Sequence, residues 1–213
     1  IMLEWIAIIT MLIDHIGYEF FPTDLTWRTI GRIAFPIYTF LLVRGLTLTR
    51  NRSTYFKRLV GIAVLAQIPF TLLFEIYTLN VIFTLLYGAS AVVLYEKVSR
   101  IWGIFILVIL GLIMLPISDF TDYGIYGYLL FLLYYFLKEK SVALLIGHIS
   151  LDVLYSLNYF GSWHSIQSFS IFATIIIIFK NYLPKVKIPR LFYRAFYPAH
   201  LLILYLLSLL IHG

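Results

Sequence analysis

An aspartate and a histidine stand side by side in the apolar stretch "MLIDHIGYEFF", as Asp14 and His15. An imidazole titrates near neutral pH, so His15 is a candidate general base that takes a proton from an amine or hydroxyl and later returns it. Adjacent helical residues point about 100° apart, so Asp14 is expected to pair with Arg32 or another helix rather than with His15. The two residues together predict acid–base chemistry at this position.

Two more histidines lie in apolar stretches of the chain. His148 and Asp152 are one helical turn apart and therefore share a face, and Asp152 is a candidate to orient His15. His200, in "FYPAHLLILYLL", is the second candidate for the base. Ionisable residues in a membrane are costly and usually functional, which favours a functional role for Asp14 and His15.

For Asp152 and Arg32 a structural role is an equal alternative, because a buried ion pair can simply hold helices together. Arg32 lies at a similar predicted depth to the two acids, so these three residues are expected to compensate one another's charge.

The composition predicts an all-α, polytopic integral membrane protein. Of the 213 residues, 62% are hydrophobic and 12% are charged, with a mean hydropathy of +0.96. A soluble domain would carry roughly 25% charged residues. The absence of cysteine excludes disulfides and thiolate ligands or nucleophiles, and no metal site is predicted. The net charge of +6 is expected to anchor cytoplasmic loops rather than to bind nucleic acid.

Nine transmembrane helices are predicted, since each needs about 20 apolar residues. They form one helical-bundle domain over residues 1–213, and the first apolar segment is expected to be a retained span rather than a cleaved signal. The predicted spans are residues 3–20, 28–49, 56–76, 79–96, 101–118, 123–138, 140–158, 164–180 and 193–211.

Charge alternates along the connections between these spans. Cations gather in the even-numbered connections, whereas the odd-numbered ones hold mostly acids and Arg28. The positive-inside rule then places the N-terminus in the cytoplasm and the C-terminus outside.

Several motifs occur in a recognisable order: "IAIITMLIDHIGYEFFP", "RTIGRIAFPIYTFLLVRGLTLTRN", "YFKRLVGIAVLAQIPF", "NVIFTLLYG", "DYGIYGYL" and "FYPAHLLIL". The sequence resembles the TraX family, named for a conjugal-transfer protein that acetylates pilin, over most of its length. The resemblance implies transfer of an acetyl group from cytosolic acetyl-CoA, as co-substrate, to an amine or hydroxyl. The acceptor would be a secreted or surface peptide, glycan or lipid.

The family is also distantly similar to larger transmembrane acyltransferases, which carry a basic residue eleven positions before a catalytic histidine. Here that position is Glu4, which cannot attract a phosphate. We therefore expect other residues to bind the substrates. The cytoplasmic arginines Arg50, Arg52 and Arg58, with Arg44 behind them, form the predicted docking patch for acetyl-CoA. About 15 Å of helix or more would separate this patch from His15. The candidate substrate-binding residues are Arg32, Arg44, Arg50, Arg52, Arg58, Tyr197 and His200.

Two other functions use the same features. Intramembrane Asp, His and Arg also serve proton-coupled transporters and flippases, although the inverted repeats typical of transporters are not evident. A non-catalytic assembly protein of a surface-export system would need no chemistry and would tolerate His15→Ala. The cations from Arg50 to Arg58 could equally contact membrane lipid headgroups.

Overall fold

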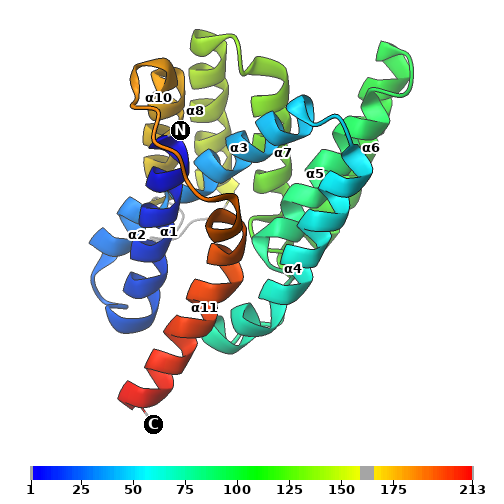
Figure 1. The fold of residues 1–213 in the computed structure, drawn as a ribbon. Coiled ribbons are helices and arrows are strands. Elements are labelled where there is room, and N and C mark those ends of the chain that lie inside the picture. The colour runs from blue at the N-terminus through cyan, green and yellow to red at the C-terminus, as the bar shows by residue number, and fades with distance from the viewer. Residues whose placement is uncertain (1, 159–165, 213) are drawn as a thin grey trace.

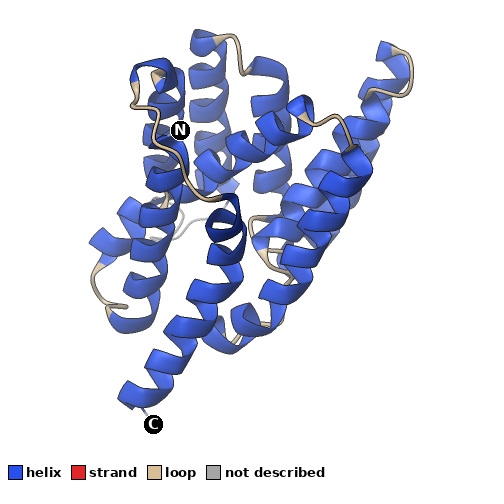
Figure 2. Cartoon of the chain, in the orientation of Figure 1, coloured by secondary structure: helices blue, strands red, loops and turns tan. Residues whose placement is uncertain are grey.

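The structure is a computed structural model that describes residues 2–158 and 166–212, and its regular elements there are helices (Figures 1 and 2). Short 3₁₀ turns are η1 (Ser118–Phe120), η2 (Ser168–Ser170) and η3 (Lys180–Tyr182). The α-helices are α1 (Met2–Phe20), α2 (Leu25–Gly31), α3 (Ala34–Leu48), α4 (Arg52–Phe74), α5 (Val81–Tyr95), α6 (Arg100–Ile117), α7 (Gly124–Leu137), α8 (Ser141–Asn158), α10 (Ile171–Ile178) and α11 (Arg190–His212).

Four helical stretches in the described part of the chain are long and apolar enough to cross a membrane. They are Leu25–Leu48, Arg52–Phe74, Arg100–Phe120 and Arg190–Ile211. Shorter apolar helices lie at Val81–Tyr95, Gly124–Leu137, Ser141–Leu157 and Ser168–Ile178. The all-helical character of the described residues is thus confirmed, and the four long apolar stretches are consistent with a membrane protein, while the nine-span topology remains a prediction.

Two predicted spans differ in detail from the structure. The second is interrupted between α2 and α3, at Arg32 and Ile33. The eighth was predicted to begin at residue 164, which lies outside the described residues, and its described part contains the eight-residue helix α10.

The interior helix α3 joins the two sides of the molecule. It packs against α1, α5, α7 and α10, while α4 packs against α11 (Figure 1). One apolar core, which includes Phe40 and Phe131, lies around α3, α5 and α7. A second core, which includes Phe70 and Leu201, joins α4 to α11. Helix α11 also packs against α1, so the last helix lies beside both α1 and α4.

Local sequence features set where α2 and α3 begin. Asp24 caps α2 by accepting a hydrogen bond from the Thr26 amide at 2.9 Å. After Arg32 and Ile33, α3 restarts with Pro36 in its first turn, where the missing N–H leaves no helical hydrogen bond unmade. A short helix carrying Arg28 and Arg32 therefore lies against α1, with which it makes extensive contact.

Gly31 permits this close approach. A Cβ at this position would lie 2.0 Å from Oδ1 of Asp14. Any larger residue must therefore displace either α2 or the Asp14 side chain.

We predict that Gly31→Ala lowers the free energy of unfolding by about 1–3 kcal/mol, the usual cost of overpacking. Gly61→Ala is the matched control, because a Cβ there meets nothing within 4 Å. Since Ala favours helix over Gly by about 1 kcal/mol, that variant should be unchanged or more stable. Denaturant unfolding in detergent micelles measures both, and equal stabilities would contradict the packing described here.

Candidate functional site

The Asp14 carboxylate is held between two guanidinium groups. Arg28 Nη1 donates to Oδ2 at 2.9 Å, and Arg32 Nη2 donates to Oδ1 at 2.9 Å. Asp14 is only 7% exposed, so each ion pair is largely shielded from water. The predicted pairing of Asp14 with Arg32 is therefore confirmed.

Arg28 was missed as a partner of Asp14 because the charge count treated it as a cation of a connecting loop. Its spacing of four residues from Arg32 was an available signal, since residues at i and i+4 share a helical face. With α2 folded as a helix, both side chains reach the same carboxylate.

The two candidate bases, His15 and His200, are hydrogen-bonded to each other. His200 Nδ1 lies 2.7 Å from the carbonyl oxygen of Phe196, which can only accept, so Nδ1 of His200 carries a proton. In neutral His200 the Nε2 atom is then an acceptor, and His15 Nδ1 donates to it across 2.8 Å. This chain of donors leaves Nε2 of neutral His15 unprotonated and able to take a proton.

The His15 Nε2 atom lies 4.0 Å from Oδ2 of Asp14, beyond hydrogen-bonding distance. The carboxylate is nevertheless close enough to stabilise a positive charge on the ring once His15 is protonated. Asp14 and His15 thus cooperate through space rather than through a direct hydrogen bond.

The prediction that Asp152 orients His15 is wrong, because the two residues belong to different parts of the bundle. Helix α1 packs against α2, α3 and α11, whereas α8, which carries Asp152, packs against α7 and α10. His200 occupies the position at Nδ1 of His15 that Asp152 was predicted to take.

Asp152 instead belongs to a buried polar network between α7, α8 and α10. It accepts hydrogen bonds from Tyr126 at 2.7 Å and Ser170 at 3.0 Å, and lies 3.6 Å from His148 on its own helix. The shared face of His148 and Asp152 is therefore confirmed. Neither of these residues lines the two cavities described below, so the network is best explained as joining three helices.

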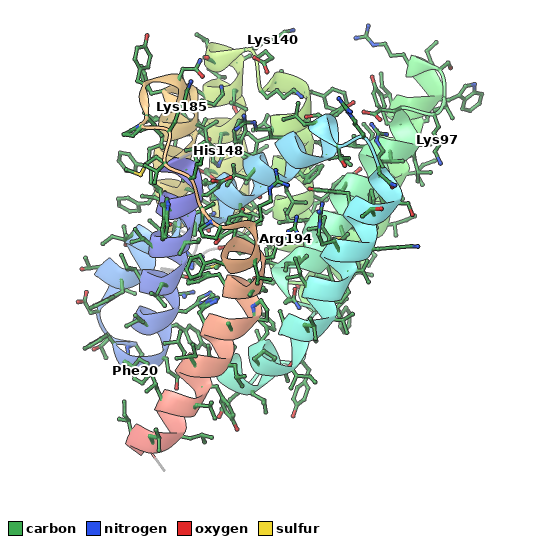
Figure 3. All side chains as sticks on the ribbon, in the orientation of Figure 1. Phe20, Lys97, Lys140, His148, Lys185 and Arg194 are labelled. Carbon is green, nitrogen blue, oxygen red and sulfur yellow. The ribbon has the colours of Figure 1, made fainter. Side chains whose placement is uncertain are left out.

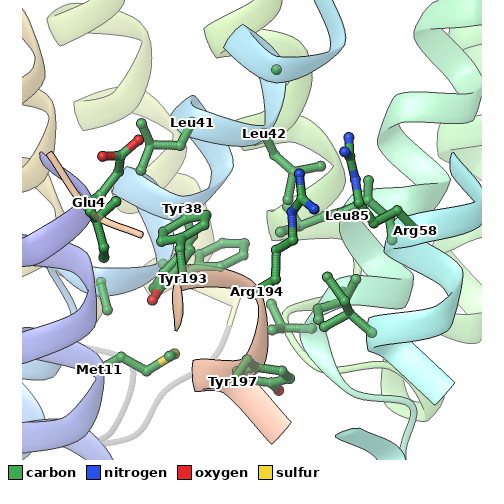
Figure 4. A pocket seen from close by; sticks show the side chains of 18 of the residues that line it. Glu4, Met11, Tyr38, Leu41, Leu42, Arg58, Leu85, Tyr193, Arg194 and Tyr197 are labelled. Atoms are coloured by element: carbon green, nitrogen blue, oxygen red, sulfur yellow. The ribbon is translucent and has the colours of Figure 1, made fainter. Parts of the chain in front are cut away.

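A cavity of about 740 Å³ leads to His15 (Figure 4). Both Glu4 and His15 line it, and because they are eleven residues apart on α1 the cavity follows that helix for about 16 Å. Tyrosines and aliphatic side chains form most of its wall between these ends. The lining tyrosines are Tyr38, Tyr55, Tyr123, Tyr193 and Tyr197.

Cations from two distant segments line the same cavity. Arg58 comes from α4, while Lys187, Arg190 and Arg194 come from the loop before α11 and from its first turns. Arg194 lies near the start of α11, in the middle of the molecule (Figure 3), and Arg58 is its electrostatic neighbour. These late cations were predicted only as a topology signal, and the packing of α11 on α4 brings them to the cavity.

Only some of the predicted substrate-binding residues lie at this cavity. Arg58 and Tyr197 line the cavity, but Arg44, Arg50 and Arg52 are not among its lining residues. Arg52 forms an ion pair with Glu96 instead. Arg44 lies within α3, Arg50 lies in the connection that follows it, and Arg52 is the first residue of α4.

A smaller cavity of about 190 Å³ lies on the other side of the arginine pair. Arg28, Arg32, Tyr155, Ile166 and Gln167 line it, and it shares Asp122 and Tyr123 with the large cavity.

Asp122, which both cavities share, lies in the connection between η1 and α7. Burial raises the pKa of Asp122 to about 6, against the opposing effect of Arg32. This carboxyl is therefore held less firmly in its charged form than an exposed aspartate would be.

We predict that Asp14→Asn lowers the free energy of unfolding by about 3–5 kcal/mol, because it leaves two buried cations without their carboxylate. Combining it with Arg28→Gln should recover part of this loss, since one uncompensated charge is then removed. Unfolding in detergent measures the wild type and the two variants; a double variant less stable than Asp14→Asn alone would show that charge compensation is not what holds α1 to α2.

Comparison with known proteins identifies the family of this chain. No solved structure matches it. Protein TraX of Escherichia coli is 28% identical over 98% of this chain and 86% of its own length. A Dichelobacter nodosus protein named "Probable fimbrial assembly protein FimC, serogroup H1" is 30% identical over 71% of this chain and 69% of its own length. Since the TraX protein family profile matches residues 1–208, the chain belongs to the TraX family.

Proposed function

We propose that this protein is a membrane-embedded acetyltransferase that moves an acetyl group from acetyl-CoA to an amine or hydroxyl. One observation carries the proposal: a single cavity connects a group of cations with an imidazole whose Nε2 is available as a base. Acyl transfer needs both an anchor for the polyanionic nucleotide and a base for the acceptor's proton.

The cations at the cavity suit the phosphates of acetyl-CoA. Arginine binds phosphate through two parallel hydrogen bonds, and lysine acts as a compact point charge. In this arrangement the nucleotide lies near Arg58, Arg190 and Arg194, and the pantetheine arm extends along the part of the cavity that Tyr38 and Tyr193 line. The thioester then reaches the depth of His15.

The proposed transfer step needs no reagent besides acetyl-CoA and the acceptor. The acceptor's nitrogen or oxygen attacks the thioester carbonyl carbon, while His15 Nε2 takes the proton that the nucleophile loses. The new C–N or C–O bond forms, the C–S bond breaks, and the same proton passes from His15 to the leaving thiolate to give free CoA. Asp14, at 4.0 Å, stabilises the imidazolium that exists in between.

His200 serves as a positioning residue in this scheme. Its proton on Nδ1 is fixed by the Phe196 carbonyl, so its Nε2 holds His15 in the tautomer that a base requires. His200 does not itself line the cavity, which supports His15 rather than His200 as the base.

The predicted topology indicates the side of the membrane from which acetyl-CoA would enter. With the N-terminus in the cytoplasm of a bacterial cytoplasmic membrane, the connections that carry Arg58 and Arg194 face the cytosol, where acetyl-CoA is made. The relatives are named for TraX and for fimbrial assembly, which fits an acceptor on a secreted or surface molecule. A non-catalytic assembly role fits those names as well, and the position of His15 in the cavity favours the enzyme.

His15→Gln should slow acetyl transfer or acetyl-CoA hydrolysis by at least about 100-fold, the lower range for loss of a general base. Binding of acetyl-CoA should be retained, since the cations are unchanged. His148→Gln is the matched control, because it alters a buried histidine outside the cavity and should keep the rate per folded molecule. Thiol release by protein in nanodiscs measures the rates. Equal rates for wild type and His15→Gln would exclude His15 as the base.

Arg58→Gln and Arg194→Gln should each raise the KM for acetyl-CoA by about tenfold, which corresponds to about 1.4 kcal/mol, with little change in kcat. The effect should shrink at high salt, because the lost interaction is electrostatic. Arg100→Gln, which removes an exposed cation that lines neither cavity, is the control. Loss of kcat with an unchanged KM would contradict a docking role, and absence of any acetyl-CoA binding to folded wild type would favour the transporter or assembly function.

A further inference from the structure

Two cations line the smaller cavity. The guanidinium groups of Arg28 and Arg32 share one carboxylate, that of Asp14. An anion that enters this cavity would therefore lie against two guanidinium groups that have a single carboxylate between them.

Arg32 also has hydrogen-bonding capacity directed into this cavity. Its Nη1 donates to Tyr123 Oη at 3.3 Å and to Gln167 Oε1 at 3.5 Å, both long for a guanidinium. Charge-assisted hydrogen bonds from arginine to an oxyanion are typically about 2.7–2.9 Å and roughly twice as strong as neutral ones. A carboxylate or phosphate oxygen is thus a better acceptor for Arg32 than either neutral partner.

The two cavities are lined by residues from different sets of connections between the predicted spans. The small cavity is lined by residues beside the first, fifth and seventh connections, represented by Arg28, Asp122 and Ile166. The cations of the large cavity come from the second and eighth connections. In the predicted topology odd-numbered connections lie outside and even-numbered ones inside, so the cavities would serve substrates that arrive from opposite sides.

We propose that the small cavity is the acceptor subsite and binds an oxyanion carried by the acceptor near the group that is acetylated. This inference rests on the proposed acetyltransferase function. The shared residues Asp122 and Tyr123 form the boundary across which the acceptor's amine or hydroxyl approaches His15. Arg28 and Arg32 bind the anionic group from one side, while Asp14 keeps both guanidinium groups in place.

Matched pairs of small probes test this subsite. The first pair is glycylglycine and glycylglycinamide, which differ in a carboxylate; the second is phosphoethanolamine and ethanolamine, which differ in a phosphate. Calorimetry with the full chain in nanodiscs measures their binding, and acetyl-CoA-dependent thiol release measures their use as acceptors. At least one anionic probe should bind about tenfold more tightly than its neutral partner, a difference of about 1.4 kcal/mol. Whether the carboxylate or the phosphate is preferred identifies the chemistry of the acceptor.

Two variants separate the subsite from a general effect of charge. Arg28→Gln removes one cation while Arg32 still pairs with Asp14, and Gln167→Glu places a carboxylate next to Arg32 Nη1, where it competes with an anionic probe. Each should abolish the preference for the anionic probe, whereas Arg100→Gln should retain it. Equal binding of charged and neutral probes, binding of none, or a preference that survives both variants would overturn the subsite.

The two proposals fail in distinguishable ways. Binding of acetyl-CoA and its hydrolysis that depends on His15, both measured without any acceptor, test the acetyltransferase alone. If these are present and the anion preference is absent, only the acceptor subsite is wrong. If the anion preference is present and acetyl-CoA does not bind, the acetyltransferase is wrong and the inference that rests on it is withdrawn.

Discussion

The Asp14 carboxylate, shared by two guanidinium groups, is the interaction on which the site depends. A charge in a weakly polar interior is expensive unless it is paired, so each of the three side chains requires the others. Their pairing needs α2 as a separate short helix, and it needs Gly31 so that α2 can approach α1 closely. The four-residue spacing of Arg28 and Arg32, together with the close approach at Gly31, brings both guanidinium groups to one carboxylate.

The same carboxylate links the acid–base and electrostatic parts of the site. It lies beside His15 at the deep end of the large cavity, and its two cationic partners line the small cavity. The cation group around Arg58 and Arg194 lies along α1 from this centre, at the end where Glu4 also lines the cavity. Other segments of the chain supply cations to the cavity that Glu4 also lines. The cavity is therefore lined by cations although α1 itself carries an acid at position 4.

The sequence predicted those parts of the site that depend on local spacing or on charge complementarity. The pairing of Asp14 with Arg32 and the shared face of His148 and Asp152 are of this kind. The hydrogen bond between His15 and His200 is different, because 185 residues separate them and only the packing of α11 against α1 brings them together. Asp152 was assigned to the wrong histidine for the same reason, since apolar periodicity does not tell which helices are neighbours. The cations that line the cavity were missed for a similar reason: Arg194 joins Arg58 there through the contact of α11 with α4, whereas Arg50 and Arg52 are not among the lining residues.

The most direct test of the central claim is a structure of the protein in nanodiscs with acetyl-CoA bound. The account predicts phosphate groups beside Arg58 and Arg194, with the thioester carbonyl next to His15 Nε2 and nothing between them. A nucleotide bound elsewhere, or a thioester that ends away from His15, would contradict it.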